Sequence, residues 1–124
     1  MILADTSIWI EMFRRGVFRA ELDTLIAKDQ LCTHPFVVAE LACGYLPDRQ
    51  KTLTYLDNLI ALPPVRLTDL RIMIEARGLA SSGIGLTDAY LIASCLATPG
   101  TRIWTVDAAL GRVAESLGIR AINL

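Results

Sequence analysis

The chain has 124 residues, a formal net charge of −1 and a mean hydropathy of +0.46. A chain of this length buries roughly two-thirds of its unfolded surface, so we expect a single domain over residues 1–124. The near-neutral charge excludes a broadly basic nucleic-acid coat. No apolar run approaches the ~18 residues that cross a bilayer, so no membrane partner is expected.

Three cysteines, Cys32, Cys43 and Cys95, are widely spaced and odd in number. This spacing favours neither a disulfide framework nor a zinc site, and it predicts buried thiols in a reducing, cytoplasmic environment. The apolar content of 53% is high for a soluble monomer. Two explanations stay open, an interface with another subunit or partner and a well-filled core.

Short apolar runs alternate with stretches of helical periodicity along the whole chain. In chain order, the first half is predicted to contain a strand over 2–4, a helix directly after it, a helix over 20–28, a strand over 31–33, a helix over 36–45 and a helix marked by Leu53, Leu56 and Ile60. The second half is predicted to contain a strand over 65–67, a helix over 68–78, a helix over 87–97, a strand over 102–105, a helix over 108–117 and a strand over 119–122.

Strands that are separated by helices pair in parallel through right-handed crossovers. The expected fold class is therefore α/β, a three-layer α/β/α sandwich with a central parallel sheet of about five strands. Ligands of such sheets bind at the carboxyl ends of the strands, near the point where the strand order reverses.

Four acidic residues are candidates for a ligand site at the carboxyl ends of the strands. Asp5 directly follows the first strand, Asp107 follows the fourth, and Asp88 opens the most apolar helix. Each of these three has a structural explanation as a helix cap or a favourable first-turn charge. Glu40 differs, because it lies in the run V-V-A-E-L, which is otherwise too apolar to be exposed, so it is expected to be buried. A carboxylate there should be buried only if it is paired, neutralised or bound to metal.

Carboxylates gathered at one sheet edge repel one another, by about 4 kcal/mol for a pair roughly 4 Å apart at an effective dielectric of about 20. A divalent cation, or a proton held on one acid, relieves this repulsion. Oxygen ligands without histidine or cysteine select Mg²⁺ or Mn²⁺. These ions bind phosphates and activate water, so the acids point to phosphodiester chemistry.

At these positions the sequence resembles a known family. The motifs are D-T-S at 5–7, Glu40 in V-V-A-E-L, Asp88 in T-D-A-Y-L-I-A and Asp107 in T-V-D-A-A-L. This ordered set resembles the PIN-domain ribonucleases over essentially the whole chain. Among them, the length and motif spacing are most similar to the VapC-like toxins of bacterial toxin–antitoxin pairs.

The resemblance implies a single PIN-like domain that cleaves RNA as an endoribonuclease. Asp5, Glu40, Asp88 and Asp107 would be its catalytic residues and would hold Mg²⁺ or Mn²⁺. Thr6, Ser7 and Thr105 would orient the carboxylates, with helix capping as an equal alternative. It further implies a homodimer and a cognate antitoxin that covers the acidic groove.

Where some relatives carry a further acid beside the position of Asp88, this chain has Thr87. The number of metal ions therefore stays open. Two alternative functions also stay open, a housekeeping nuclease in RNA processing and a catalytically silent binding module. A haloacid-dehalogenase-like phosphatase is disfavoured because Ser7 replaces the second aspartate of D-x-D. A response-regulator receiver domain is disfavoured because neither Lys28 nor Lys51 follows a late strand.

The remaining polar residues give weaker indications. His34, the only histidine, is predicted to be structural because it precedes a proline at a strand end. Arg14, Arg15 and Arg19 flank the first helix and are either RNA phosphate contacts or solvated side chains.

Overall fold

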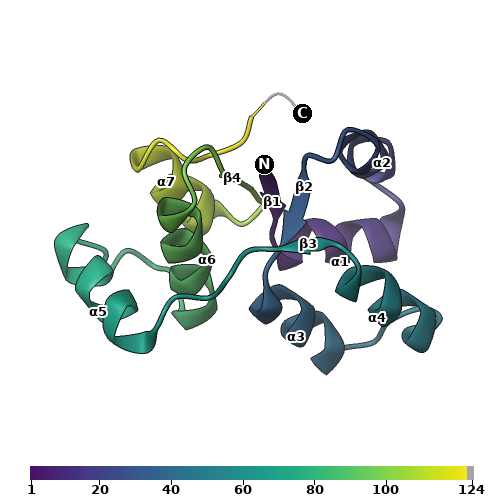
Figure 1. Cartoon of the computed structure of the whole chain (residues 1–124), viewed down its shortest axis with the longest axis horizontal. Coiled ribbons are helices and arrows are strands. Elements are labelled where there is room, and N and C mark those ends of the chain that lie inside the picture. Colours follow the sequence, from purple (N-terminus) through teal and green to yellow (C-terminus); the bar gives the residue numbers. More distant parts are fainter. Residues whose placement is uncertain (123–124) are drawn as a thin grey trace.

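A parallel four-stranded sheet forms the middle layer of the computed structural model, which describes residues 1–122 (Figure 1). Its strands are β1 (Ile2–Ala4), β2 (Leu31–Thr33), β3 (Ile60–Ala61) and β4 (Arg102–Trp104). They lie in the order β3-β2-β1-β4. The chain adds β2 and β3 on one side of β1 and then crosses back to add β4 on its other side, so the strand order reverses between β1 and β4.

Helices cover both faces of this sheet (Figure 1). On one side lie α1 (Thr6–Arg15), α2 (Arg19–Ala27), α3 (Pro35–Cys43) and α4 (Arg49–Asp57). On the other lie α5 (Leu67–Ala76), α6 (Leu86–Ala97) and α7 (Ala108–Ser116). The helices change sides where the strand order reverses, as right-handed crossovers require. The predicted three-layer α/β/α architecture is confirmed.

The predicted third strand is wrong in position. Residues 65–67 are not a strand, and Leu67 is the first residue of α5. The strand lies at Ile60–Ala61, where Leu62 N donates to Thr33 O at 2.8 Å. Pro63 and Pro64 follow this strand, and because proline has no N–H to donate they end the pairing with β2. The preceding helix ends at Asp57, before Ile60.

The predicted fifth strand over 119–122 is reduced to a single bridge beside β4. Arg120 pairs in parallel with Ile103, and Ile103 N donates to Ile119 O at 2.7 Å while Ala121 N donates to Ile103 O at 2.8 Å. This segment therefore continues the sheet past β4 without forming a full strand.

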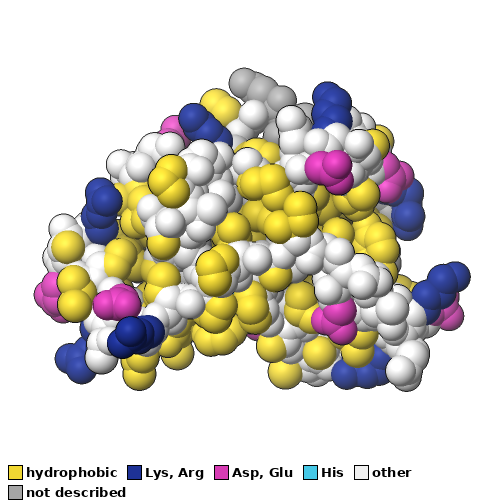
Figure 2. Space-filling model, viewed as in Figure 1, with side chains coloured by type: hydrophobic (Ala, Val, Ile, Leu, Met, Phe, Trp, Pro, Cys, Tyr) yellow, Lys and Arg dark blue, Asp and Glu magenta, His cyan; other side chains and the backbone are white. Residues whose placement is uncertain are grey.

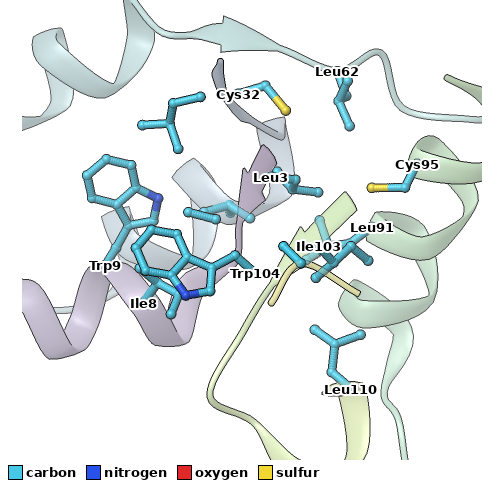
Figure 3. Packing of buried hydrophobic residues seen from close by; sticks show 14 of the residues in the cluster. Leu3, Ile8, Trp9, Cys32, Leu62, Leu91, Cys95, Ile103, Trp104 and Leu110 are labelled. Carbon is cyan, nitrogen blue, oxygen red and sulfur yellow. The ribbon is translucent and has the colours of Figure 1, made fainter. Parts of the chain in front are cut away.

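The core lies around the sheet, where Leu3, Ile103, Leu91 and Leu110 pack together with Trp9 from α1 (Figure 3). Cys32 and Cys95 are part of this core, and burial raises the pKa of their thiols to about 11 and about 12. These two thiols are inert at neutral pH because they stay protonated. The prediction that all three cysteines are buried is wrong for Cys43, which is exposed at the end of α3.

The surface retains a large apolar component. Figure 2 shows hydrophobic side chains gathered over the middle of one face, with charged side chains mostly around its rim. The largest exposed apolar side chains include Tyr45, Ile60, Ile72 and Leu86. No helix within residues 1–122 is long and apolar enough to cross a membrane.

Candidate active site

The reversal of strand order brings Asp5 and Asp107 to one edge of the sheet. Asp5 is the first residue after β1, and its backbone N–H donates to Trp104 O of the neighbouring strand β4 at 3.1 Å. Asp107 follows β4 after a short turn and caps α7. This is the position at which open parallel sheets bind their ligands.

Asp5 is held by three donors and is only 3% exposed. Ser7 Oγ donates to its Oδ1 at 2.5 Å, and Ile8 N donates to the same oxygen at 3.2 Å as a helix cap of α1. Thr105 Oγ1 donates to Oδ2 at 2.5 Å. Burial raises the pKa of Asp5, while the donated hydrogen bonds oppose that rise. The carboxylate is thus fixed in one orientation.

The same two hydroxyls also position the turn that carries Asp107. Ser7 Oγ accepts from Val106 N at 3.1 Å, and Thr105 Oγ1 accepts from Asp107 N at 2.9 Å. Asp107 Oδ1 in turn accepts from Leu110 N at 2.8 Å. A single network therefore connects the ends of β1 and β4, which are about a hundred residues apart in sequence.

Glu40 reaches this edge from α3, and its side chain is exposed. The expectation that it lies buried among apolar residues is wrong, because the helical period turns Val37 and Leu41 into the core and Glu40 away from it. Its Oε1 accepts from Thr6 Oγ1 at 2.7 Å. Thr6, the first residue of α1, therefore links Glu40 to the helix that Asp5 caps.

Asp88 lies in the first turn of α6, and the charges of the other three acids act on its carboxyl group. Its pKa is raised to about 6, mainly by burial and further by the charges of Asp5, Asp107 and Glu40. These carboxylates share one electrostatic field although they come from four separate segments of the chain. Hydrogen bonds through hydroxyl side chains connect Asp5 with Asp107 and with the helix that contacts Glu40, and the charges of these three acids act on Asp88.

The donor set fits a hard divalent cation, because it offers carboxylate oxygens without histidine or cysteine. Within residues 1–122, however, no three acidic, histidine or cysteine side chains already converge closely enough to hold an ion.

Comparison with known proteins identifies the family of this fold and site. Residues 2–116 of the chain match the PIN domain. The chain belongs to the PIN domain family. This PIN domain is 36% identical over 119 residues to Ribonuclease VapC32 of Mycobacterium tuberculosis, in both strain CDC 1551 / Oshkosh and strain ATCC 25618 / H37Rv. The match covers 96% of this chain and 94% of each relative.

A solved structure shares the fold of the PIN domain. The crystal structure of PAE2754 from Pyrobaculum aerophilum superimposes with a TM-score of 0.63 at 16% sequence identity. The superposition covers 94% of this chain and 90% of that chain.

His34 supports the PIN domain from within the core and lies outside the acidic network. It is fully buried, and its Nδ1 accepts from Phe36 N at 3.0 Å as the cap of α3. Its Nε2 therefore carries the proton and donates to Ser94 Oγ of α6 at 3.1 Å, and Ser94 Oγ donates to Pro63 O at 2.9 Å. This chain of hydrogen bonds joins the helices that carry Glu40 and Asp88.

Replacing Thr105 by valine should impair the site without changing its shape. The variant loses the donor to Asp5 Oδ2 and the acceptor for Asp107 N. Loss of a residue that orients a metal ligand typically reduces activity by roughly 10- to 100-fold. The measurement is the initial rate of RNA cleavage at saturating Mg²⁺, together with the thermal unfolding midpoint.

Thr101→Val is the matched control for this change. Thr101 lies just before the other end of β4 and is buried, and its hydroxyl has no hydrogen-bond partner among the described residues. Its replacement should leave activity unchanged and stability equal or higher. Equal loss of activity in both variants would show that any hydroxyl removed beside β4 has this effect.

Sequence reasoning missed a cavity that adjoins Glu40. A pocket of about 370 Å³ lies between α1, α3 and the segment 44–47, and Glu40, Arg14 and Tyr45 are among its lining residues. A larger cavity of about 450 Å³ between α1, α2 and α4 contains none of the four acids. The only sequence signal for the smaller pocket is the aromatic residue Tyr45 between Gly44 and Leu46. A single aromatic residue does not by itself predict a pocket.

Proposed function

We propose that this PIN domain is a Mg²⁺- or Mn²⁺-dependent endoribonuclease and the toxin of a toxin–antitoxin pair. The proposal is supported by family membership and by 36% identity to Ribonuclease VapC32 across nearly the full length of both chains. Asp5, Glu40, Asp88 and Asp107 are the proposed catalytic and metal-holding residues.

The observation that carries the proposal is the electrostatic coupling of these acids. Asp88 has a pKa of about 6 because it is partly buried beside three other carboxylates. A fold whose acids served only as helix caps would gain nothing from placing them in one field. Asp5, Glu40, Asp88 and Asp107 would hold a divalent cation, which would supply charge neutralisation, polarisation of a phosphodiester and activation of water.

The side chains around this cluster prepare the ligands. Asp5 already accepts three hydrogen bonds, which leaves about one of its roughly four acceptor positions open, at Oδ2. It would therefore bind through one oxygen. Glu40 is oriented by Thr6, and Asp107 is oriented by Leu110 N. A cation would relieve the repulsion that Asp5, Asp107 and Glu40 exert on the ionised form of Asp88.

The partners follow from the proposed toxin role. RNA is the substrate, a cognate antitoxin covers the acidic groove, and the toxin is a homodimer in the cytoplasm. The hydrophobic side chains gathered over the middle of one face support contacts of this kind, because exposed apolar patches commonly mark protein interfaces (Figure 2).

The purified chain should cleave total RNA in the presence of Mg²⁺ or Mn²⁺, and EDTA should stop the reaction. Re-addition of the metal should restore it, which separates loss of the ion from loss of the fold. Asp5→Asn is the control for contaminating nuclease, because asparagine keeps the helix cap while removing the charge. Cleavage that persists in EDTA and in Asp5→Asn overturns the mechanism.

The same pair of proteins tests the toxin role in cells. Expression of the native chain should arrest growth, expression of Asp5→Asn should not, and co-expression of the small protein encoded beside it should restore growth. Arrest by both versions, or the absence of such a neighbouring gene, would favour the alternative of a housekeeping nuclease.

A further inference from the structure

The pocket between α1, α3 and the segment 44–47 lies directly beside the acidic cluster. Glu40 belongs to both, because it is one of the four acids and also lines this pocket. The floor is apolar and comes mainly from Phe13, Leu41 and Leu46. A volume of about 370 Å³ is at the lower end of the range for small-ligand sites, which suits one nucleoside.

Tyr45 stands at the rim of the pocket, and the residue is 91% exposed. A large aromatic side chain in this position contributes almost nothing to the core, so folding does not explain it. Aromatic rings presented to solvent beside a nucleic-acid site serve as stacking platforms for unpaired bases.

Arg49 fixes the segment that carries Tyr45. Its Nη2 donates to Ala42 O at 2.6 Å, and its Nη1 donates to Gly44 O at 3.2 Å. These carbonyls lie at the carboxyl end of α3, where a cation is also favoured by the helix dipole. The backbone that carries Tyr45 is thus held in place by these hydrogen bonds, which lowers the entropy cost of stacking its ring on a base.

Arg14 supplies positive charge at the same pocket. It is exposed in the last turn of α1 and makes no ion pair or hydrogen bond within residues 1–122, whereas its neighbour Arg15 pairs with Glu11 at 3.0 Å. Thr6, which holds Glu40, begins the same helix, about 12 Å away along its axis. An extended single strand that crosses the acids would bring a neighbouring phosphate within reach of Arg14.

We propose that this pocket binds the base of an unpaired RNA nucleotide next to the cleaved bond, with Tyr45 stacking on the base and Arg14 contacting a flanking phosphate. The proposal rests on the proposed ribonuclease function and adds a base-binding subsite next to the acidic cluster. A base stacked inside a duplex does not reach such a pocket without leaving the helix. Duplex RNA is therefore a poor ligand.

The test separates binding from cleavage. In EDTA, a fluorescent single-stranded oligoribonucleotide of mixed sequence is titrated with the native chain and with variants, and anisotropy gives the Kd. Tyr45→Ala should weaken binding by roughly 5- to 150-fold, the range for loss of one base–aromatic stack. Tyr45→Leu should be weakened similarly, since it keeps apolar bulk without a flat ring, whereas Tyr45→Phe should bind like the native chain.

Two controls localise the effect. Tyr55→Ala removes a half-exposed tyrosine that lies on α4 and lines the separate larger cavity, and it should leave the Kd unchanged. Arg14→Ala should reduce the salt dependence of binding by about 0.7 in log–log slope, the value for one single-strand phosphate contact. Arg71→Ala, on the exposed surface of α5, should leave that slope unchanged.

Kinetics on a strand that spans a mapped cleavage site complete the test. Tyr45→Ala should raise KM with little change in kcat. Native protein that cleaves RNA while Tyr45→Ala keeps the native Kd and KM overturns the pocket assignment and leaves the ribonuclease proposal intact. RNA binding that depends on Tyr45 in a chain that does not cleave supports the pocket and overturns the ribonuclease proposal. Native protein that neither binds nor cleaves RNA overturns both.

Discussion

Asp88→Asn should stabilise the metal-free protein and remove its ribonuclease activity. The charge at Asp88 is destabilised by burial and by Asp5, Asp107 and Glu40, so a neutral amide relieves an unfavourable interaction. Relief of such charge typically adds about 0.5–2 kcal/mol to the free energy of unfolding. Activity should fall by roughly 100-fold or more, because loss of a residue that merely supports a ligand already costs 10- to 100-fold.

The stabilisation should depend on pH with a defined sign. The folded-state pKa of Asp88, about 6, lies above its ordinary value of 3.8. The folded state therefore holds the proton more tightly, and the contribution of this group to stability is lost as pH rises from about 4 to 6. Asp88→Asn removes that loss, so its advantage over the native chain should be largest above pH 6 in EDTA.

The chain contains a matched control for this experiment. Asp69 occupies the same third position of α5, in the sequence L-T-D, that Asp88 occupies in α6. Asp69 is exposed, so Asp69→Asn should lose a favourable first-turn charge and leave activity unchanged. Thermal unfolding in EDTA and initial cleavage rates in Mg²⁺ measure both effects. A lower unfolding temperature in both variants would show that Asp88 is only a helix-terminal charge.

Acidification should destabilise the protein through His34, in the direction opposite to the effect of Asp88. Burial lowers the pKa of His34 from 6.5 to about 4, because its ring is fully enclosed. Its contribution is complete above pH 6.5 and is lost as pH falls toward 4, amounting to on the order of 3 kcal/mol. A proton added at Nδ1 would also break the cap that this atom provides for α3.

His34→Asn isolates the contribution of His34 protonation to the loss of stability in acid. Asparagine preserves a capping acceptor for α3 but does not titrate. The variant should be less stable at pH 7, by on the order of 2 kcal/mol, because it leaves a cavity and removes the hydrogen bond to Ser94. Denaturant unfolding between pH 4 and 7, performed in the Asp88→Asn background, should show a flatter pH dependence than the same background with His34. An unchanged slope would assign the acid sensitivity to other groups.

The sequence was sufficient for the features that depend on local chemistry and on the order of elements. Asp5 and Asp107 follow apolar runs that become β1 and β4, and parallel pairing then brings them together. The third strand was misplaced because Ile60 continues the helical spacing of Leu53 and Leu56, while a strand of only two residues has too few positions to show alternation.

Other features depend on tertiary contacts that no local pattern encodes. The exposure of Glu40 depends on which side of α3 meets the sheet, and an apolar helix does not specify that side. The role of Ser7 and Thr105 as donors to one carboxylate requires the β1–β4 pairing. The pocket at Tyr45 depends on Arg49 folding back onto the carboxyl end of α3. These features were therefore established only by the structure.

The pairing of β1 with β4 has a consequence for synthesis of the protein. The first strand lies between β2 and β4, and Asp5 accepts a hydrogen bond from Thr105, which lies about a hundred positions later in the sequence. A nascent chain that still holds residues 102–107 within the ribosome lacks one neighbour of β1, one donor to Asp5 and the Asp107 carboxylate. The acidic edge of the sheet is thus completed only after residues 102–107 have been synthesised, so a truncated product ending before β4 should show no ribonuclease activity.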